Sequence, residues 1–402
     1  MTMIILRAYA TIPEFFNAIF NTTAFPNIPF NTYGFFVAMG FMVAAIATSF
    51  ELKRRGELGM IADIPSIEII GAKPKWQDFI FPVFMAFFAG MKIVGALIHN
   101  KALLTNGQNT VAYLFSSEGY PIYGFIGAAI AAGYTYYSIN KAALPEPKEE
   151  KFNIKPQDLI GELVFVAAVF GVIGASMFEL IQPNSDMTLL ELFSDPMNFL
   201  SGLTIYGGLT FGIIGVSIYA WYRKLKPFIL FDSLAPGFIL AMAFGRMGCH
   251  FSGDGDWGVV NTAPAPAWLP EYFWSNHYAH NVIGEGEKIV GCVGHYCSQL
   301  VPGVFPTAIY EIFMFFILFA LMWTVRKKVT RFPGFMFMLL FVVSGIERFP
   351  IEMIRVTDRF PSFFNLSQAQ IISVCMIIVG TAGMIYLGMR HKKLKLNSKK
   401  DY

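Results

Sequence analysis

Long apolar runs separated by short polar segments dominate the pattern of hydrophobic and polar positions along the chain. A helix needs about 20 predominantly apolar residues to cross the hydrocarbon core of a bilayer. Runs near this length predict nine membrane-spanning helices, over residues 33–50, 77–98, 121–139, 158–181, 202–221, 228–248, 306–325, 334–350 and 368–389. The pattern therefore indicates an all-α polytopic integral membrane protein.

Composition agrees with this class. Aromatic residues make up 16% of the chain and charged residues only 14%, with 42 phenylalanines. A soluble globular domain carries more charge and fewer aromatic residues than this. The first thirty residues show no obvious cleavable signal peptide, so we expect the first span to direct insertion. Cys375 lies inside the last span, where we expect a small apolar core residue.

Basic charge alternates from loop to loop. Of the 30 lysine and arginine residues, 22 follow the first, third, fifth, seventh or ninth predicted span. Because lysine and arginine accumulate in cytoplasmic loops, this alternation predicts an N-terminus outside the cell and a C-terminus in the cytoplasm. Nine spans fit that orientation, whereas eight or ten do not.

One long polar segment interrupts the spans and suggests three regions. Residues 1–252 hold the first six helices, 253–305 an extracytoplasmic cap, and 306–402 the last three helices with a basic cytoplasmic tail. A polar segment as long as this cap is seldom structureless. Cys292 and Cys297 could form a disulfide there if the segment is extracytoplasmic. Its histidines show no recognised metal spacing, and we expect no metal and no cofactor.

The second and third spans resemble the fourth and fifth. Residues 73–78 (KPKWQD) open the second span, and 155–158 (KPQD) open the fourth. The third and fifth spans each begin with an Ile-Tyr-Gly sequence, at 122–124 and 205–207. These landmarks predict a duplicated two-helix unit in one orientation, over 77–139 and 158–221. Chance similarity between two apolar hairpins is the alternative.

Unusual polar side chains lie at the outer ends of several predicted spans. They are Tyr33, Lys92, Tyr206, Arg246, Glu311 and Arg348. Ionisable groups in membrane spans face the protein interior and mark functional sites. The inner ends show flanking charges in loops without embedded acids, so we expect one polar site beneath the outer surface. Several arginines suit the phosphate of a lipid headgroup.

Two stretches supply most of this polar chemistry. If the eighth helix continues past Pro350, which should kink it, then Arg348, Glu352 and Arg355 share one face. Residues 245–258 combine an arginine, a histidine, two aspartates and five glycines. Glycine permits positive φ and a close approach of the backbone to a ligand. A plain turn after the helix, with its arginine reaching the interface, is the alternative.

Taken in order, these motifs resemble the bacterial prolipoprotein diacylglyceryl transferases. The matching elements are Tyr33-Gly34, Ile205-Tyr206-Gly207-Gly208, Gly245-Arg246-x-Gly248, Pro306-Thr307-x-x-Tyr310-Glu311, Arg348-Phe349-x-x-Glu352-x-x-Arg355 and Gln370. The resemblance implies seven spans, with an outer domain between the glycine-rich motif and the span that carries the Tyr-Glu pair. The duplicated hairpin would raise seven spans to nine.

The resemblance implies a multi-pass enzyme of the bacterial cytoplasmic (inner) membrane. Its reaction would transfer the diacylglyceryl group of phosphatidylglycerol to the lipobox cysteine of a prolipoprotein signal peptide, forming a thioether and releasing glycerol phosphate. Expected partners are these two substrates and membrane lipids, with no nucleic acid. The alternatives are a phospholipid-binding paralogue that uses another acceptor, and a transporter of a small anion or lipid.

The candidate residues divide into two groups. Those expected to take part in catalysis are Arg246, Arg348, Tyr206, Glu352 and His250. Those expected to bind substrate are Tyr33, Lys92, Gly245, Gly253, Asp254, Asp256, Tyr310, Glu311, Arg355 and Gln370. By the resemblance, Arg246 and Arg348 hold the phosphate, and Glu352 orients Arg348 or the headgroup. The two aspartates could bind a cation or pair with Arg246, and we expect the pairing.

This sequence departs from the family pattern at four positions. Tyr206 stands where typical members have a histidine thought to transfer a proton, and a tyrosine with a pKa near 10 is a poorer base at neutral pH. Cys249 and Ser252 replace two asparagines, and Asp254 replaces a glutamate. His250 could serve as the base instead, or could be a packing residue.

Overall fold

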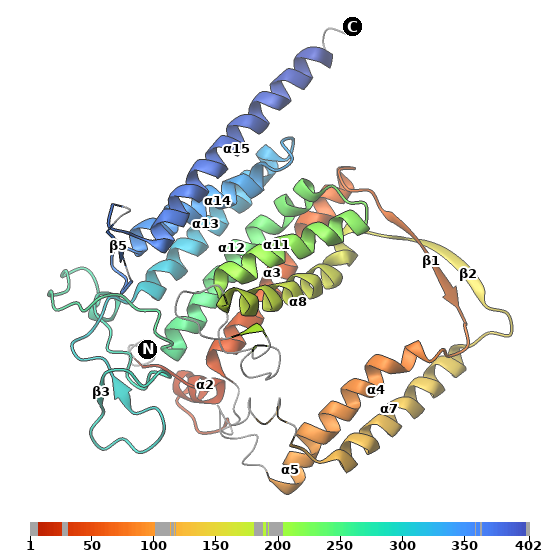
Figure 1. Ribbon diagram of the computed structural model, residues 1–402, viewed down its shortest axis with the longest axis horizontal. Helices are drawn as coiled ribbons and strands as arrows, with labels where there is room; N and C mark the ends of the chain where they lie inside the picture. Colours follow the sequence, from red (N-terminus) through yellow and green to blue (C-terminus); the bar gives the residue numbers. More distant parts are fainter. Residues whose placement is uncertain are drawn as a thin grey trace. The chain divides into compact units, whose positions relative to one another are not determined.

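The structure of the chain is a computed structural model, and it is mostly helical (Figure 1). It describes residues 7–25, 31–100, 113, 116, 118–180, 188–189, 192, 204–357, 359–361 and 364–398. Within these ranges, the side chains of residues 68, 179, 205, 206 and 392–398 are not part of the description.

Two compact units make up the chain, and each is described by itself. The first unit comprises Met1–Pro26, Phe30–Ile61 and Ala220–Tyr402. The second unit comprises Asn27–Pro29 and Ala62–Tyr219.

Among the described residues, the first unit contains six α-helices. They are α2 (Ile12–Phe20), α3 (Thr32–Glu57), α12 (Pro227–Ser252), α13 (Thr307–Val329), α14 (Phe335–Ile351) and α15 (Gln368–Ser398). α3 packs along α12, and α14 packs along α15 (Figure 1). Local sequence sets several of these boundaries. The Asn31 side chain accepts a hydrogen bond from the backbone N–H of Tyr33 at 2.8 Å and so caps α3, while α12 begins with Pro227 in its first turn.

An apolar core joins three of these helices. It contains Ala235, Ile239 and Ala243 of α12, Phe315 and Met322 of α13, and Met336, Leu340 and Val343 of α14. Side chains at three- and four-residue spacing lie on one face of a helix. This packing holds the middle of α12 beside α13 and α14, which positions the site described below.

The segment between α12 and α13, called the cap segment from here on, is folded, although it contains little regular structure. It holds the short 3₁₀ helix η4 (Glu271–Phe273) and the paired strands β3 (Glu287–Lys288) and β4 (Ser298–Gln299). Backbone hydrogen bonds join Val282 to Ser252 and Gly253 at the end of α12. A second small pair, β5 (Arg359–Phe360) and β6 (Leu366–Ser367), precedes α15.

The second unit contains two helical hairpins and a β-ribbon. Its helical segments are α4 (Gln77–Ala89), the π-helical η1 (Gly90–Val94), α5 (Gly95–His99), α7 (Pro121–Ala142), the 3₁₀ helix η3 (Pro156–Leu159), α8 (Ile160–Glu179) and α11 (Ile205–Tyr222). Strand β1 (Ile64–Ile70) pairs antiparallel with β2 (Lys148–Ile154). The ribbon was not predicted, because its strands are separated by the whole of the first hairpin.

The predicted repeat has matching local structure at its two starting points. Asp78 accepts a hydrogen bond from the backbone N–H of Lys75 at 2.8 Å, and Asp158 accepts one from Lys155 at 3.3 Å. Small residues let each hairpin close: a Cβ on Gly127 would lie 2.5 Å from the carbonyl oxygen of Ala86. The duplication stays a prediction that these features support.

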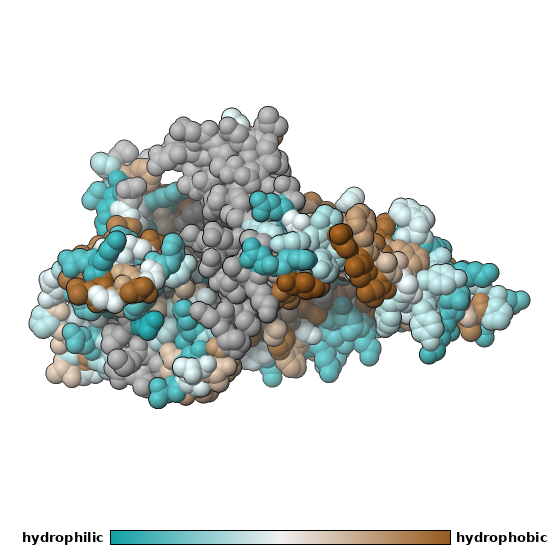
Figure 2. Space-filling model, turned by 90° about the horizontal axis from the view of Figure 1, so that it is seen from below, coloured by the Kyte–Doolittle hydropathy of each residue, from teal (hydrophilic) through white to brown (hydrophobic). Residues whose placement is uncertain are grey.

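Every predicted span coincides with a helix among the described residues, and the chain is a polytopic membrane protein. Within the part of the chain that the structure describes, six helical stretches are long and apolar enough to cross a membrane: Thr32–Glu57, Gln77–His99, Pro156–Phe178, Pro227–Ser252, Thr307–Val329 and Gln368–His391. Large apolar side chains are exposed along them, and hydrophobic patches (brown) reach the surface in Figure 2. The count of nine crossings, their orientation and the extracytoplasmic cap stay predictions.

Two helix ends differ from expectation. α12 continues to Ser252, four residues beyond the predicted end, so the first half of the glycine-rich stretch is helical. α14 ends at Ile351 with Glu352 as its C-cap. Pro350 lies in the last turn, and Arg355 lies beyond the helix. The expectation that Arg355 shares a helical face with Arg348 and Glu352 is therefore wrong.

Buried acids also lie at the ends of α3 and α12 that were expected to carry only loop charges. Glu51, 1% exposed, bonds to Arg54, Arg55 and Arg326. Asp232, also 1% exposed, accepts the backbone N–H groups of Gly334 and Phe337 at 2.8 and 2.9 Å. The expectation of no embedded acids there is wrong. Because α3 extends to Glu57, Glu51 lies within the helix rather than in a loop after it.

Candidate functional site

Three arginines and three carboxylates form one alternating chain of ion pairs in the first unit. In order along this series of ion pairs, the residues are Glu352, Arg348, Glu311, Arg246, Asp256 and Arg355. They come from α12, α13 and α14 and from the loops that follow α12 and α14. Equal numbers of opposite charges make the arrangement nearly neutral, which lowers the cost of burying it.

Glu311 is the centre of this chain. Its Oε2 lies 3.2 Å from Nε of Arg246, and its Oε1 lies 3.0 Å from Nη1 of Arg348. The Glu311 side chain is 0% exposed. One buried carboxylate therefore brings the two arginines of the sequence prediction to a common place, and it joins α12 to α14 through the first turn of α13.

The chain of ion pairs extends from Glu311 in both directions. Nη2 of Arg348 lies 3.0 Å from Oε2 of Glu352, a contact between residues four apart. The two carboxylate oxygens of Asp256 contact Arg246 and Arg355 separately. The pairing of Arg246 with Asp256 is thus present. Arg355 reaches Asp256 because the backbone N–H of Val259 donates to Ile354 at 2.8 Å, which holds the segment after α14 against the loop.

The aspartates of the loop have different electrostatic surroundings. Burial would raise the pKa of the Asp256 carboxyl, but the guanidinium groups of Arg246 and Arg355 outweigh it and lower this pKa below its ordinary value. Burial, together with the negative charge of Asp256, raises the pKa of the Asp254 carboxyl. Asp256 is therefore ionised within the chain of ion pairs, whereas ionising Asp254 costs more free energy than ionising an exposed aspartate.

Several polar atoms in this region retain bonding capacity. Nε and Nη1 of Arg355 are buried, with no hydrogen-bond partner among the described residues. The Arg348 side chain is 25% exposed, so this end of the chain is reachable. Guanidinium N–H groups that lack partners suit the oxygen atoms of a phosphate. The arrangement can hold an anion and stabilise charge that develops on it.

Glycines shape the loop, and their roles differ from one position to another. Gly253 ends α12 with φ +63°, and a Cβ there would lie 2.9 Å from Cβ of Ala8. This left-handed cap turns the chain back over the helix end. Gly245 is helical, and a Cβ on it would meet nothing within 4 Å. Packing inside the protein therefore does not require a glycine at position 245, and its contact with substrate stays a prediction. Gly248, whose Cβ would lie 3.2 Å from Tyr33, allows a close contact within the protein.

Two tyrosines flank the chain of ion pairs. Tyr33 lies in the first turn of α3 beside Gly248, and its side chain is 42% exposed. The hydroxyl of Tyr310, next to Glu311 on α13, donates to the carbonyl of Phe273 in the cap segment at 2.6 Å. Tyr310 thus fastens the cap segment to α13.

Two predicted residues of the first unit have contacts that explain them without a substrate. His250 is 3% exposed, and its Nδ1 lies 3.1 Å from the Tyr278 hydroxyl in the cap segment. Gln370 and Ser367 exchange side-chain and backbone hydrogen bonds of 3.0 and 3.2 Å, which is a capping box at the start of α15. The Ser-x-x-Gln spacing could have indicated this role in the sequence.

Lys92 and Tyr206 belong to the second unit. The Lys92 ammonium, in the π-helical turn η1, donates to the carbonyls of Tyr113, Ser116 and Glu118. Three acceptors satisfy all three of its donors. Tyr206 lies in the first turn of α11, and its side chain lies outside the described residues.

Sequence reasoning missed two residues beside the chain of ion pairs. The hydroxyl of Thr307 donates to the backbone carbonyl of Asp256 at 2.9 Å and fixes the loop to α13. Glu347 is 4% exposed, and its Oε1 has no hydrogen-bond partner among the described residues. An acid directly before Arg348 in an apolar helix was the available signal.

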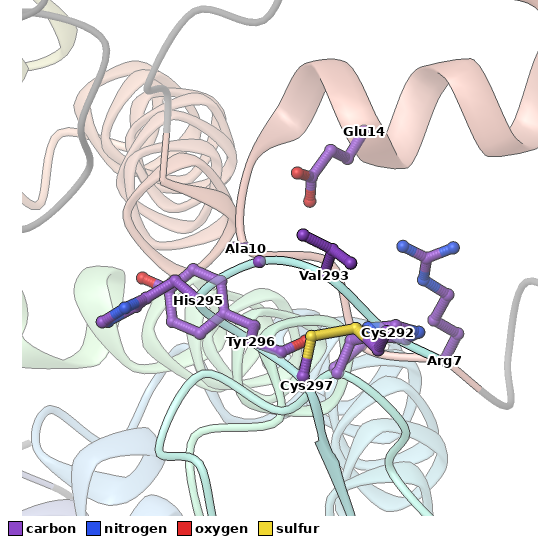
Figure 3. A pocket seen from close by; sticks show the side chains of 11 residues that line it. Arg7, Ala10, Glu14, Cys292, Val293, His295, Tyr296 and Cys297 are labelled. Carbon is purple, nitrogen blue, oxygen red and sulfur yellow. Dashed lines mark hydrogen bonds between the residues drawn. A yellow bond between two sulfur atoms is a disulfide. The ribbon is translucent and has the colours of Figure 1, made fainter. Parts of the chain in front are cut away.

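A disulfide joins Cys292 and Cys297 in the cap segment. The bond lies in the wall of a cavity of about 190 Å³, which Arg7 and Glu14 line from the N-terminal segment (Figure 3). Cys375 is exposed on α15 rather than in a core, so that expectation was wrong.

We expect thiol labelling of the denatured protein to modify two cysteines without reductant and four after reduction. Cys249 and Cys375 are free, whereas the other two are bonded. Mass spectrometry of the labelled chain counts the modified sites. Four labelled cysteines without reductant would show that the bond does not form, as happens in a reducing compartment.

Comparison with known proteins finds a matching family. The family model described as prolipoprotein diacylglyceryl transferase matches residues 118–386. A phosphatidylglycerol–prolipoprotein diacylglyceryl transferase from Staphylococcus haemolyticus is 29% identical over 239 residues, covering 59% of this chain and 76% of the relative. One of the same name from Clostridium perfringens is 28% identical over 289 residues, covering 71% of this chain and 97% of the relative. A Corynebacterium diphtheriae relative, also of this name, is 29% identical over 231 residues, covering 56% of this chain and 76% of the relative.

Proposed function

Because the chain belongs to the prolipoprotein diacylglyceryl transferase family, we propose that it transfers the diacylglyceryl group of phosphatidylglycerol to the lipobox cysteine of prolipoproteins. The protein is a multi-pass membrane transferase, and we place it in the bacterial cytoplasmic membrane. Its substrates are then phosphatidylglycerol and the membrane-bound signal peptide of a prolipoprotein.

One observation carries the assignment of the site: the Glu311 carboxylate contacts both Arg246 and Arg348. Two arginines held by one buried acid have fixed positions before substrate arrives. Such pre-organised positive charge stabilises a developing anion without further reorganisation. The exposed part of Arg348, and the Arg355 nitrogens that have no partner in the described part of the chain, give a phosphate its points of contact.

The reaction needs a nucleophilic sulfur and a stabilised leaving group. The acceptor sulfur forms a bond to the terminal glycerol carbon of the diacylglyceryl group, and the bond from that carbon to the phosphate oxygen breaks. The electron pair of the broken bond leaves with glycerol phosphate, whose charge faces the arginines. The thiol proton ends on the released phosphate or on water. A free thiol has a pKa of about 8.5, so this proton must be removed for fast reaction at neutral pH.

The remaining candidates take supporting roles in this proposal. Tyr33 contacts the lipid beside α12, and Tyr310 holds the cap segment over α13. Glu352 orients Arg348 through their ion pair. His250 and Tyr206 are the side chains that the sequence offers for accepting the proton.

The direct test is transfer of a labelled diacylglyceryl group from phosphatidylglycerol to a lipobox peptide by the purified full-length protein. We expect the wild type to transfer label and to release glycerol phosphate. Complementation of cells depleted of their own transferase checks the same activity in the membrane. Binding of phosphatidylglycerol without transfer would favour the paralogue with another acceptor. Movement of the lipid or of an anion without transfer would favour a transporter.

We expect Tyr206→Phe to lower kcat by less than about tenfold, because a tyrosine with a pKa near 10 is a poor base at neutral pH. The pH profile of kcat/KM should keep its shape. The matched variant His250→Gln tests the other candidate. A loss of about 100-fold or more in Tyr206→Phe would instead identify its hydroxyl as the proton acceptor.

A further inference from the structure

Three potential metal ligands converge where α12 ends. Sγ of Cys249 and carboxylate oxygens of Asp254 and Asp256 all lie within 4.8 Å of one another. Cys249 belongs to the last turn of α12, and the aspartates follow in the loop. The positive φ angles of Gly253 (+63°) and Gly255 (+100°) turn the loop back, so both aspartates lie over the helix end.

Cys249 is buried, the two aspartates are partly exposed, and the bonding of the group is incomplete. Cys249 is 7% exposed. Oδ1 of Asp254 is buried, with no hydrogen-bond partner among the described residues. An unsatisfied buried carboxylate oxygen is costly, and a cation would offset that cost. Cys249 and Asp254 are also two of the positions at which this chain departs from the family's sequence pattern. These two unusual residues therefore lie close to each other in the structure as well as in the sequence.

We propose that Cys249, Asp254 and Asp256 bind a Zn²⁺ ion whose open coordination position takes the acceptor thiol, an inference that rests on the proposed function. One thiolate and two carboxylates are ligands that zinc accepts, and three protein ligands with an open fourth position are typical of catalytic zinc sites. Ligand atoms around one tetrahedral zinc lie roughly 3.5 Å apart, from bond lengths of about 2.0–2.3 Å. The observed atoms therefore need only small side-chain movements.

The ion pairs of Asp256 are compatible with such a site. An ionised carboxylate accepts about four bonds, so Asp256 can keep Arg246 and Arg355 while one remaining lone pair faces the metal. The Cys249 sulfur accepts a hydrogen bond from Nη1 of Arg246 at 3.8 Å. The arginines also balance the charge, since three anionic ligands exceed the two positive charges of zinc by one.

A metal at this place would solve the proton problem of the reaction. A thiol that coordinates zinc is deprotonated, so the acceptor sulfur arrives as a thiolate without a strong protein base. Its lone pair then forms the bond to carbon, the carbon–oxygen bond breaks, and the released thiol proton goes to water or to the product phosphate. Nothing is oxidised or reduced. The chain can therefore carry Tyr206 where typical members of the family have a histidine.

The experiment uses the purified full-length protein in detergent with phosphatidylglycerol. Metal content is measured after dialysis, and Co²⁺ is then exchanged into the site to report on a sulfur ligand by its thiolate-to-cobalt absorption. Cys249→Ser removes the sulfur ligand, and Cys249→Asn places the residue of the family's signature there. Cys375→Ser is the matched control, because Cys375 is free and exposed on α15. Thermal unfolding shows which variants are folded.

We expect about one zinc per chain in the wild type and in Cys375→Ser, with cobalt absorption in both. Cys249→Ser and Cys249→Asn should bind zinc about 100-fold more weakly and lose the absorption. Removal of zinc by a chelator should abolish lipid transfer, and added Zn²⁺ should restore it.

The failures of the two proposals are distinguishable. Zinc bound equally by Cys249→Ser and the wild type would be an adventitious ion only, and would overturn the metal site. Full transfer by the metal-free protein would overturn the role of the metal while leaving the proposed function intact. Zinc bound through Cys249 by a protein that never transfers lipid would support the site and reject the proposed function.

Discussion

Replacing Arg246 with alanine should lower kcat/KM for diacylglyceryl transfer by about 100- to 1000-fold, the loss typical when one pre-organised donor to a developing anion is removed. The fold should persist. Each carboxylate that Arg246 contacts has a second arginine: Arg348 stays with Glu311, and Arg355 stays with Asp256. The variant therefore leaves neither acid without a partner.

The transfer assay and thermal unfolding, run on the same preparation, separate catalysis from folding. Arg246→Lys is the matched control, because lysine keeps the charge but cannot contact Glu311 and Asp256 with a planar fork. We expect its activity to lie between those of the alanine variant and the wild type. Transfer by Arg246→Ala at more than a tenth of the wild-type rate would contradict the assignment of Arg246 to the phosphate.

Glu311→Gln should have the largest effect on stability, about 3–5 kcal/mol, which is typical of breaking a buried ion pair by removing one partner. Glu311 is fully buried and contacts two arginines, so the neutral amide removes the countercharge that they share. Arg246 then keeps only Asp256, and Arg348 keeps only Glu352. The measurement is the thermal unfolding temperature in a fixed detergent.

Glu352→Gln is the control for this prediction. It makes the same chemical change at the end of the chain of ion pairs, where only Arg348 is affected and that arginine keeps Glu311. We expect a smaller loss of stability and a reduced kcat. Equal unfolding temperatures for the two variants would mean that the central position of Glu311 has no energetic consequence.

Much of the helical architecture could be predicted because each span is encoded locally. An apolar run of sufficient length forms a helix in a membrane whatever lies next to it. The strands β1 and β2 escaped prediction because they pair across about eighty residues, and neither has a turn partner nearby. Glu51 escaped for a related reason: its arginine neighbours looked like loop charges until α3 was seen to continue to Glu57.

The site could be predicted as far as charged side chains meet one another. Arg246, Glu311 and Arg348 were expected together because uncompensated charge in a membrane span requires a partner. Lys92 was given a substrate role because its partners are backbone carbonyls, which a sequence does not reveal. Gln370 was given one by the resemblance, although its spacing from Ser367 is that of a helix cap. Arg355 was placed on a helix that stops before it, although its contact with Asp256 retains it in the site.

Two buried acids, Asp232 in α12 and Glu311 in α13, take part in contacts that attach the two ends of α12 to neighbouring helices, and these contacts restrict how the protein can move. Asp232 fastens the first turns of α12 to the start of α14, and Arg246 fastens the last turns to Glu311 of α13. Sliding α12 by one turn, about 5.4 Å, would break both attachments at once. Admission of a two-chain lipid must then come from rearrangement of loops and of less tightly fastened helices, with α12 as the stationary element.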